Sequence, residues 1–223
     1  MNDRKINIFI AGHNGLVGRT LRKKLDTFKN YKIITVERSN LDLINQLEVN
    51  NFLKNNVIDV IIIAAARVGG IYANSNFPAE FIYENIMIQS NLIHGAYKNN
   101  IKDLLFLGSS CIYPKENFYP INEEALLSGT LEKTNEPYAI AKIAGIKMCE
   151  YYNKQYSTNY KSVMPTNLYG EGDNFDELQG HVIPSLISKF NSAIKQNNSE
   201  VIVWGTGKPL REFMHVDDMA DAC

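Results

Sequence analysis

The chain has 223 residues, of which 45% are hydrophobic and 21% charged, the values of a globular protein long enough for one full domain. Its net charge of −1 argues against binding to nucleic acid or to a membrane surface through bulk charge. No stretch approaches the ~18–20 apolar residues of a membrane span, and the N-terminus lacks a signal-peptide pattern. The cysteines are sparse and odd in number (Cys111, Cys149 and Cys223), which favours reduced thiols and a cytoplasmic location.

The first predicted unit is a strand, a glycine turn and a helix. Ile6–Ala11 is an apolar run, and Arg19–Leu25 has helical periodicity. Between them, glycines recur at every third residue, which allows the backbone to approach a pyrophosphate at the positive end of a helix. A glycine turn that binds nothing is the alternative. The unit predicts a dinucleotide site formed by Gly12, His13, Asn14, Gly15, Leu16, Val17 and Gly18.

Lys32–Val36 is the second predicted strand, and the residues after it select the dinucleotide. Glu37 could bind a ribose 2′-hydroxyl, as in NAD enzymes, whereas Arg38 could bind a 2′-phosphate, as in NADP enzymes. We favour Arg38 and NADP(H), and NAD stays open. The following residues either line the cofactor site or form an ordinary loop; they are Ser39, Asn40, Leu41, Asp42 and Leu43.

Further strands are predicted at Val57–Ala64, Asp103–Leu107 and Tyr160–Met164, with a long helical pattern over Phe77–Tyr97. Val57–Ala64 is nearly all apolar, as in a parallel strand that is covered on both faces. Strands that alternate with helices in this way indicate an α/β fold with a Rossmann-type parallel sheet and helices on both faces.

Four candidate residues follow predicted strands: Gly12, Arg38, Ala65 and Ser109. Ligands of open parallel sheets bind beyond the carboxyl ends of the strands. We therefore expect these four residues to meet at one ligand site.

Asn135–Lys142 is predicted to begin a helix, because Pro137 suits the first turn and Asn135 can cap it. Tyr138 and Lys142 are four residues apart and share one helical face. A nearby ammonium should lower the pKa of a phenol from its usual value of about 10, so that the pair can exchange a proton with a carbinol or carbonyl oxygen. The same spacing also arises by chance in helices that have no catalytic role.

These features together resemble the extended short-chain dehydrogenase/reductase family. Within it, the most specific similarity is to enzymes that epimerise carbons 3 and 5 of a GDP-linked 4-keto-6-deoxy sugar and then reduce carbon 4 with NADPH. The resemblance implies conversion of GDP-4-keto-6-deoxy-D-mannose to GDP-L-fucose. It is carried by blocks along the whole chain: Ile10–His13, Ala64–Ile71, Leu107–Lys115, Thr134–Lys142, Met164–Gly170, His181–Pro184 and Arg211–Met219.

The resemblance also implies chemical roles. In the reduction, Ser109 would hydrogen-bond the 4-oxygen, Tyr138 would protonate it, and Lys142 would lower the pKa of the tyrosine and bind the nicotinamide ribose. In the epimerisation, Cys111 would act as base and His181 as acid. Spacing alone favours a buried apolar role for Cys111 and a helix-start role for His181, and the resemblance reverses that preference.

Further contacts are implied by the same resemblance. Lys189, Trp204 and Arg211 would contact the substrate, since a nucleotide diphosphate calls for cations and an aromatic ring. A solvated lysine and a core aromatic are the alternatives for the first two. No metal is expected. The implied cofactor contacts include Lys142, His181 and two strand-end loops, Leu107, Gly108, Ser109 and Ser110 on one and Pro165, Thr166, Asn167 and Leu168 on the other.

The C-terminal part has helical periodicity over His181–Lys195, a strand-like run at Val201–Trp204, and Asp217 in the position of a helix cap. We expect an NADP-binding Rossmann domain over residues 1–180 and a partial substrate domain over residues 181–223. Members of the family continue further, so the chain is expected to be truncated or a fragment.

Helices over Phe77–Tyr97 and Tyr138–Tyr152 are implied to pair across a two-fold axis as the four-helix contact of a homodimer. Two rival functions remain. One is another nucleotide-sugar epimerase or dehydratase, which is disfavoured because Ser110 and Cys111 stand where a dehydratase needs an acidic residue. The other is a nucleotide-binding protein without turnover.

Overall fold

The computed structural model describes residues 4–116, 120–177, 180–203, 205–208 and 210–223, and within them a five-stranded sheet is the centre of the fold. All of its strand pairs are parallel, in the order β2-β1-β3-β4-β5. This confirms the predicted Rossmann-like sheet. Because β1 lies between β2 and β3, the order of the strands reverses there, which is where open α/β sheets bind ligands. The strands are β1 (Ile6–Ala11), β2 (Tyr31–Ile34), β3 (Val60–Ile63), β4 (Asp103–Leu107) and β5 (Asn159–Val163).

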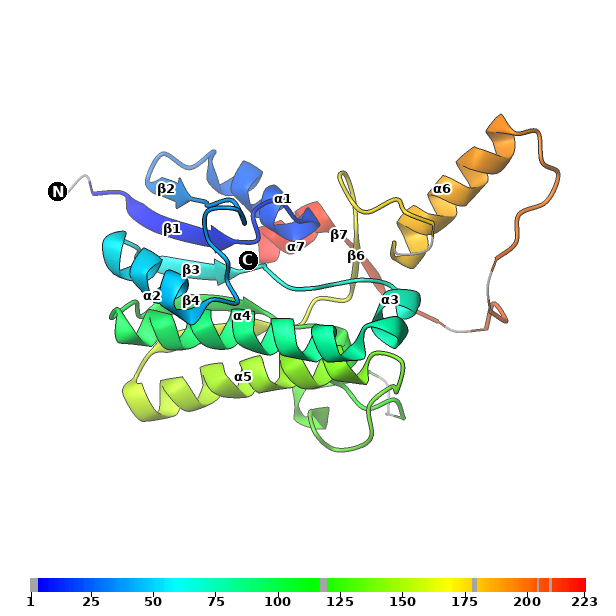
Figure 1. The fold of residues 1–223 in the computed structure, drawn as a ribbon. Helices are drawn as coiled ribbons and strands as arrows, with labels where there is room; N and C mark the ends of the chain where they lie inside the picture. Colours follow the sequence, from blue (N-terminus) through cyan, green and yellow to red (C-terminus); the bar gives the residue numbers. More distant parts are fainter. Residues whose placement is uncertain (1–3, 117–119, 178–179, 204, 209) are drawn as a thin grey trace.

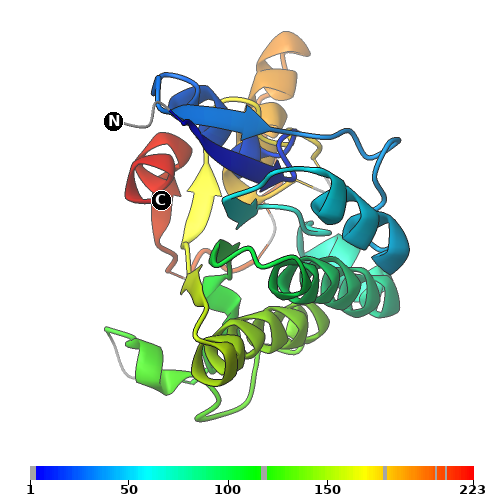
Figure 2. The same ribbon diagram turned by 90° about the vertical axis from the view of Figure 1, so that its left-hand side faces the viewer.

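Helices cover both faces of this sheet (Figure 1). On one face lie α2 (Gln46–Asn55), α4 (Pro78–Lys98) and α5 (Glu136–Tyr156), and Figure 2 shows α4 and α5 side by side. On the other face α1 (Leu16–Leu25) packs against α7 (Val216–Ala222). Among the described residues, no helix is both long and apolar enough to cross a membrane.

The remaining elements lie outside this sheet and its covering helices. A parallel pair of short strands, β6 and β7, leads to α7, and α6 stands apart from the sheet (Figure 1). These elements are α3 (Ile71–Asn76), the 3-10 turns Ser110–Ile112 and Glu123–Ala125, β6 (Asn167–Tyr169), α6 (Val182–Lys195) and β7 (Phe213–His215).

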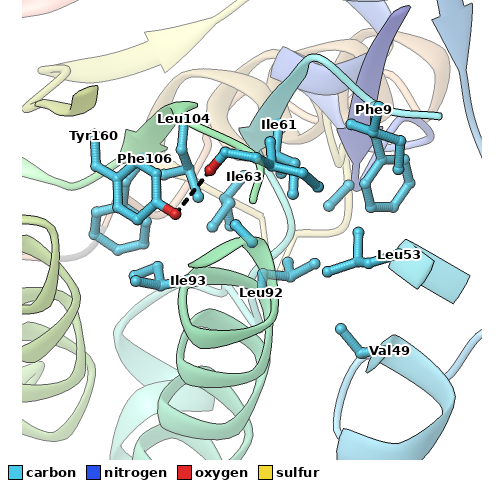
Figure 3. Close-up of a cluster of buried hydrophobic side chains, with 14 of the residues drawn as sticks. Phe9, Val49, Leu53, Ile61, Ile63, Leu92, Ile93, Leu104, Phe106 and Tyr160 are labelled. Atoms are coloured by element: carbon cyan, nitrogen blue, oxygen red, sulfur yellow. Dashed lines mark hydrogen bonds between the residues drawn. The ribbon is translucent and has the colours of Figure 1, made fainter. Parts of the chain in front are cut away.

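Alternate residues of the strands contribute to a core on each face, because successive side chains of a strand point in opposite directions. Phe9, Ile61 and Phe106 pack with α2, α4 and α5 in the larger core, which Figure 3 shows. Ile10 and its neighbours pack with α1 and α7. This double coverage explains why the three central strands, β1, β3 and β4, are mostly apolar. In the larger core the hydroxyl of Tyr160 donates to the carbonyl of Ile101 at 3.0 Å, so this buried phenol has a partner.

Some predictions about the element ends need correction. Asn135 occupies the N-cap of α5, with a proline in the first turn, but its side chain makes no capping hydrogen bond. Helix α7 is capped by His215, whose Nδ1 accepts from the amide of Asp217 at 3.3 Å, so Asp217 belongs to the first turn. Residues 201–203 form no strand within the described chain, and Trp204 lies outside the described residues.

Candidate active site

The glycine turn after β1 lies directly against the loop after β3. Gly12 has a φ of +88°, and a Cβ there would come within 2.5 Å of the backbone nitrogen of Ala65. A Cβ on Gly18 would overlap the carbonyl oxygen of Gly12. Only glycine fits these two positions, so the close approach brings the start of α1 to the place where the strand order reverses. At Gly15, by contrast, the nearest atom to a Cβ would be 3.5 Å away, which leaves room for a ligand.

Within the described part of the chain, two adjoining cavities run along the carboxyl ends of the strands. The first has a volume of about 490 Å³ and extends from Asn14–Val17 to Pro165–Leu168, where the chain enters β6. The second has a volume of about 390 Å³ and extends from Gly12–Gly15 to Arg38 and Leu41–Ile44. Because both cavities include Asn14 and Gly15, they form one elongated site with the glycine turn between its halves. That shape suits a dinucleotide.

Ser109, Tyr138 and Lys142 all line the first cavity. Lys142 is only 3% exposed, and its ammonium donates to the carbonyl of Leu107, at the end of β4, at 2.7 Å. Burial lowers the pKa of Lys142 to about 8, although the nearby Cys111 opposes this shift. The strand-end loop and α5 therefore bring the serine, the phenol and the lysine together.

The predicted effect of Lys142 on Tyr138 is wrong for this arrangement. Burial, and after it the charge of Cys111, raises the pKa of Tyr138 above its usual value. The ammonium of Lys142, 5.6 Å from the tyrosine ring, does not offset this. The phenol therefore keeps its proton, which suits donation of that proton to a carbonyl oxygen.

Cys111 and His181 reach the site differently. Cys111 is half-buried, and its backbone amide donates to Oγ of Ser109 at 3.3 Å, but it is not among the described wall residues of either cavity. Burial raises the pKa of the Cys111 thiol, and the hydrogen bond with Ser109 and the charge of Lys142 offset this only in part. His181 is exposed, precedes α6 at its N-cap, and lines the first cavity.

The two residues that could select the cofactor have different surroundings. The carboxylate of Glu37 accepts from Nδ2 of Asn14 at 2.9 Å and lies 3.2 Å from Nε2 of His13. The side chain of Arg38 is exposed and lines the second cavity. The glycine turn thus engages the carboxylate, while Arg38 keeps an exposed side chain in the wall of the second cavity, which agrees with the preference for NADP(H).

The residues of the first cavity also fit the other end of a dinucleotide. Oγ1 of Thr166 is buried there without a partner among the described residues, although buried hydroxyls are normally hydrogen-bonded. It lies in the same wall as Lys142, whose ammonium can bind a ribose hydroxyl. An unpartnered hydroxyl, a buried ammonium and an open glycine turn are what a nicotinamide nucleotide would engage.

Several predicted site residues lie elsewhere in the described structure. Lys189 and Arg211 are not among the described wall residues of either cavity, and the guanidinium of Arg211 donates to the carbonyl of Leu210 at 2.8 Å. Of the predicted cofactor contacts, the following also lie outside the described walls: Gly18, Ser39, Asn40 and Ser110.

Conversely, the structure places Asn74, Phe81 and Asp173 in the wall of the first cavity, and sequence reasoning missed all three. Phe81 belongs to a helix that was predicted, so its apolar position at the start of that helix was the available signal. Asn74 lies on a six-residue helix and Asp173 in a loop, where no periodic pattern marks them.

Comparisons with known proteins agree with this geometry. The NAD dependent epimerase/dehydratase family model matches residues 8–223. The GDP-L-fucose synthase of Escherichia coli (strain K12) is 55% identical over 218 residues, which cover 98% of this chain and 68% of that protein. A GDP-6-OMe-4-keto-L-xylo-heptose reductase from C. jejuni has a TM-score of 0.90 and 36% identity, with 100% of this chain and 72% of that chain covered. A GDP-L-fucose synthetase from Naegleria fowleri bound to NADP has a TM-score of 0.86 and 30% identity, with 98% and 72% covered.

Proposed function

Because the chain belongs to the NAD dependent epimerase/dehydratase family, we propose that it is an NADPH-dependent enzyme that converts GDP-4-keto-6-deoxy-D-mannose to GDP-L-fucose. The observation that carries this proposal is the convergence of Ser109, Tyr138 and Lys142 on one cavity beside the glycine turn. The similarity to a GDP-L-fucose synthase supports the substrate, and the similarity to a structure bound to NADP supports the cofactor.

In the reduction, the residues around the glycine turn would hold NADPH, which would supply the hydride for carbon 4 of the sugar. The hydroxyl of Ser109 donates a hydrogen bond to the 4-oxygen, and Tyr138 gives that oxygen its proton. The raised pKa of Tyr138 keeps this proton in place until negative charge develops on the oxygen. The buried ammonium of Lys142 stabilises the phenolate that remains, because it lies on the same helical face.

In the epimerisation, the same hydrogen bonds to the 4-oxygen acidify the protons on carbons 3 and 5, because the enolate places its charge on that oxygen. Cys111, two residues after Ser109, takes a proton from one face of the ring. His181, at the start of α6 and in the wall of the cavity, returns a proton to the other face. Removal and return on opposite faces invert one carbon, and proton exchange of Cys111 and His181 with water restores both groups before the second carbon is inverted.

A second candidate function is reduction of a GDP-linked 4-keto sugar without epimerisation. Cys111 favours it, because this residue is not among the described wall residues and burial raises the pKa of its thiol, which disfavours a thiolate base. The likeness to the C. jejuni reductase also favours it.

One assay separates these functions. The purified chain is incubated with GDP-4-keto-6-deoxy-D-mannose and NADPH, and the product is identified by its NMR spectrum. Formation of GDP-L-fucose supports the first function, and formation of the unepimerised 6-deoxy sugar supports the second. NADPH binding without turnover contradicts both and indicates a nucleotide-binding protein.

A variant of the proposed base makes this assay sharper. Cys111→Ser should lose epimerisation far more than reduction of an already epimerised substrate, since only the first step needs the thiolate. Cys223→Ser, at an exposed cysteine, is the control and should leave both unchanged. Equal losses of both steps in Cys111→Ser would refute its role as base.

We also propose that the enzyme works as a homodimer through the outer faces of α4 and α5. Tyr83 on α4 and Tyr151 on α5 are 57% and 55% exposed, large values for aromatic side chains on neighbouring helices. Light scattering at micromolar concentration should give the mass of a dimer, and Tyr151→Glu should give that of a monomer. A wild-type chain that stays monomeric at that concentration would contradict this assembly.

The proposal also covers the two domains of the chain and the cellular compartment in which the enzyme works. Residues 1–180 hold the cofactor and residues 181–223 contribute to the substrate side, with Lys189, Trp204 and Arg211 as substrate contacts. Helix α7 then returns to pack on α1. The cysteines, which form no disulfide, suit the reducing cytoplasm.

A further inference from the structure

Besides the hydroxyl of Thr166, two further acceptor oxygens in the wall of the first cavity have no partner among the described residues. They are Oδ1 of Asn74, a residue that is 6% exposed, and Oδ2 of Asp173. Nearly all buried polar atoms in native proteins are hydrogen-bonded, and an unpartnered one lowers stability. Two such atoms in residues that line one cavity therefore indicate that a bound ligand supplies their missing hydrogen-bond donors.

The orientation of Asn74 is fixed by its own amide nitrogen. Nδ2 donates to the carbonyls of Gly69 at 2.8 Å and Gly70 at 3.1 Å, which uses both of its protons. Only the acceptor oxygen remains for a ligand.

The orientation of the Asp173 carboxylate is also fixed by a hydrogen bond within its own loop. Its Oδ1 accepts from the amide of Asn174 at 2.7 Å, which leaves Oδ2 as the unpartnered oxygen. The preceding residue, Gly172, is tied to α1 because Arg19 donates to its carbonyl at 2.6 Å. The loop thus holds the carboxylate of Asp173 in the wall of the cavity.

Two acceptors require a ligand that brings donors. A phosphate at neutral pH is an acceptor and would be repelled by the carboxylate of Asp173, so the pyrophosphates of cofactor and substrate are unsuitable partners. Hydroxyl groups of a sugar ring are suitable. The reacting sugar must lie in this cavity, beside Ser109 and Tyr138, and a 4-keto-6-deoxy hexose keeps hydroxyls on carbons 2 and 3.

We propose that Asn74 and Asp173 form a subsite that accepts hydrogen bonds from the hydroxyl groups of the bound sugar. The subsite rests on the function proposed above, since it takes the sugar to be the ligand beside Tyr138. Its role is to orient the ring, so that the 4-oxygen meets Ser109 and Tyr138.

The test measures the affinity for the sugar separately from that for the nucleotide. Binding of GDP-L-fucose and of GDP is measured by calorimetry, and binding of NADPH by its fluorescence. The variants are Asp173→Asn, which keeps the size of the side chain and replaces an acceptor by a donor, and Asn74→Leu, which removes the acceptor. Asn76→Leu is the matched control, because Asn76 is exposed on the same helix and its Nδ2 donates to the carbonyl of Tyr72 at 2.8 Å.

We expect wild type to bind GDP-L-fucose more tightly than GDP. Each subsite variant should weaken GDP-L-fucose binding by about tenfold while binding GDP and NADPH as wild type does. The control should match wild type with all three ligands. If Asn74→Leu fails to fold, Asp173→Asn alone decides, because it is isosteric.

Three results would overturn the subsite. Weaker NADPH binding with unchanged GDP-L-fucose binding would mean that the donors belong to the cofactor. Unchanged binding of all three ligands would refute the subsite and leave the proposed function standing. A wild-type chain that binds neither GDP-L-fucose nor GDP would refute the proposed function first, and the subsite with it.

Discussion

The sheet with its covering helices and the outlying helix α6 differ in how completely they bury their apolar side chains. Leu92 and Ile93 on α4 are 0% exposed, whereas Ile187 and Ile194 on α6 are 53% and 75% exposed. Figure 1 shows the same contrast, with α4 across the face of the sheet and α6 away from it. Tyr138 and Lys142 on α5 are therefore held by the packed core, whereas His181 stands at the start of a helix whose apolar side chains are largely exposed.

The polar contacts of the sheet region and of the segment after α6 differ in a similar way. The ammonium of Lys142 is held by the carbonyl of Leu107, on a different element, whereas the guanidinium of Arg211 donates to the residue next to it in the chain. A long-range contact fixes a side chain relative to the sheet, and a contact with the adjacent residue does not. We therefore expect substitutions in the sheet region, including α7 where it packs on α1, to change stability, and those on the exposed face of α6 and at the described residues between α6 and β7 to change it little.

The largest difference should come from adding the same methyl group in the two regions. In Gly18→Ala the new Cβ would overlap the carbonyl of Gly12, so we expect a loss of at least about 3 kcal/mol in the free energy of unfolding, and no NADPH binding. Gly207 has a φ of +71°, and a Cβ there would meet no other atom within 4 Å, so Gly207→Ala should cost about 1 kcal/mol through backbone strain alone. Urea unfolding measures the free energy of unfolding of both variants. Equal losses would contradict the difference between the sheet region and the C-terminal segment.

A core truncation should give the next largest effect. Leu92→Ala removes a fully buried side chain and should lower the free energy of unfolding by about 2–5 kcal/mol. Ile194→Ala, on the outlying helix, should change it by less than about 0.5 kcal/mol. A loss of several kcal/mol at Ile194 would show that α6 is packed in solution, which would contradict the contrast between the two regions.

Replacement of Lys142 should change the free energy of unfolding by a smaller amount, and it should stabilise the chain. The pKa of Lys142 is about 8 when folded and 10.5 ordinarily, so the unfolded chain binds the proton more tightly between these values. The free energy of unfolding should therefore rise as the pH rises through this window, and below it the buried charge is unfavourable by roughly 3 kcal/mol. Lys142→Met removes that penalty and also the bond to Leu107, so a net gain of about 1–2 kcal/mol is expected near neutral pH.

Unfolding by urea at neutral and at alkaline pH measures this effect. The gain of Lys142→Met over wild type should shrink as the pH passes the window, and the variant should lack reductase activity. Lys147→Met is the control: this lysine is partly exposed and paired with Glu150, so its removal should change stability little at either pH. A destabilised Lys142→Met near neutral pH would contradict the burial penalty.

Much of the sheet could be predicted because its signals are local. β1 spans Ile6–Ala11 as predicted, since an apolar run followed by a glycine turn marks both its length and its end. Helix α2 was missed although its signal was present: Asn45 accepts from the amides of Leu47 and Glu48, and Glu48 stands three residues after it. β6 and β7 could not be predicted, because three-residue strands depend on a partner far away in the sequence.

The position of the site was predictable and its protonation was not. The rule about strand ends correctly brought Gly12 and Ser109 to the same edge of the sheet. The pKa of Tyr138 depends on burial, which arises only when α5 packs on the sheet, so the helical spacing of Tyr138 and Lys142 gave the wrong direction. Asn74 could not be recognised for a similar reason, because its proposed role rests on an acceptor oxygen that finds no partner among the described residues, which only the folded structure reveals.

The account depends most on the phenol of Tyr138 as the proton donor in the first cavity. The direct test is the rate at which Tyr138→Phe oxidises NADPH with GDP-4-keto-6-deoxy-D-mannose as substrate, with the affinity for NADPH measured in parallel. We predict a kcat lower by about 10²–10⁴-fold with unchanged NADPH affinity, because only the transferable proton is removed. Turnover close to that of wild type would contradict the central claim.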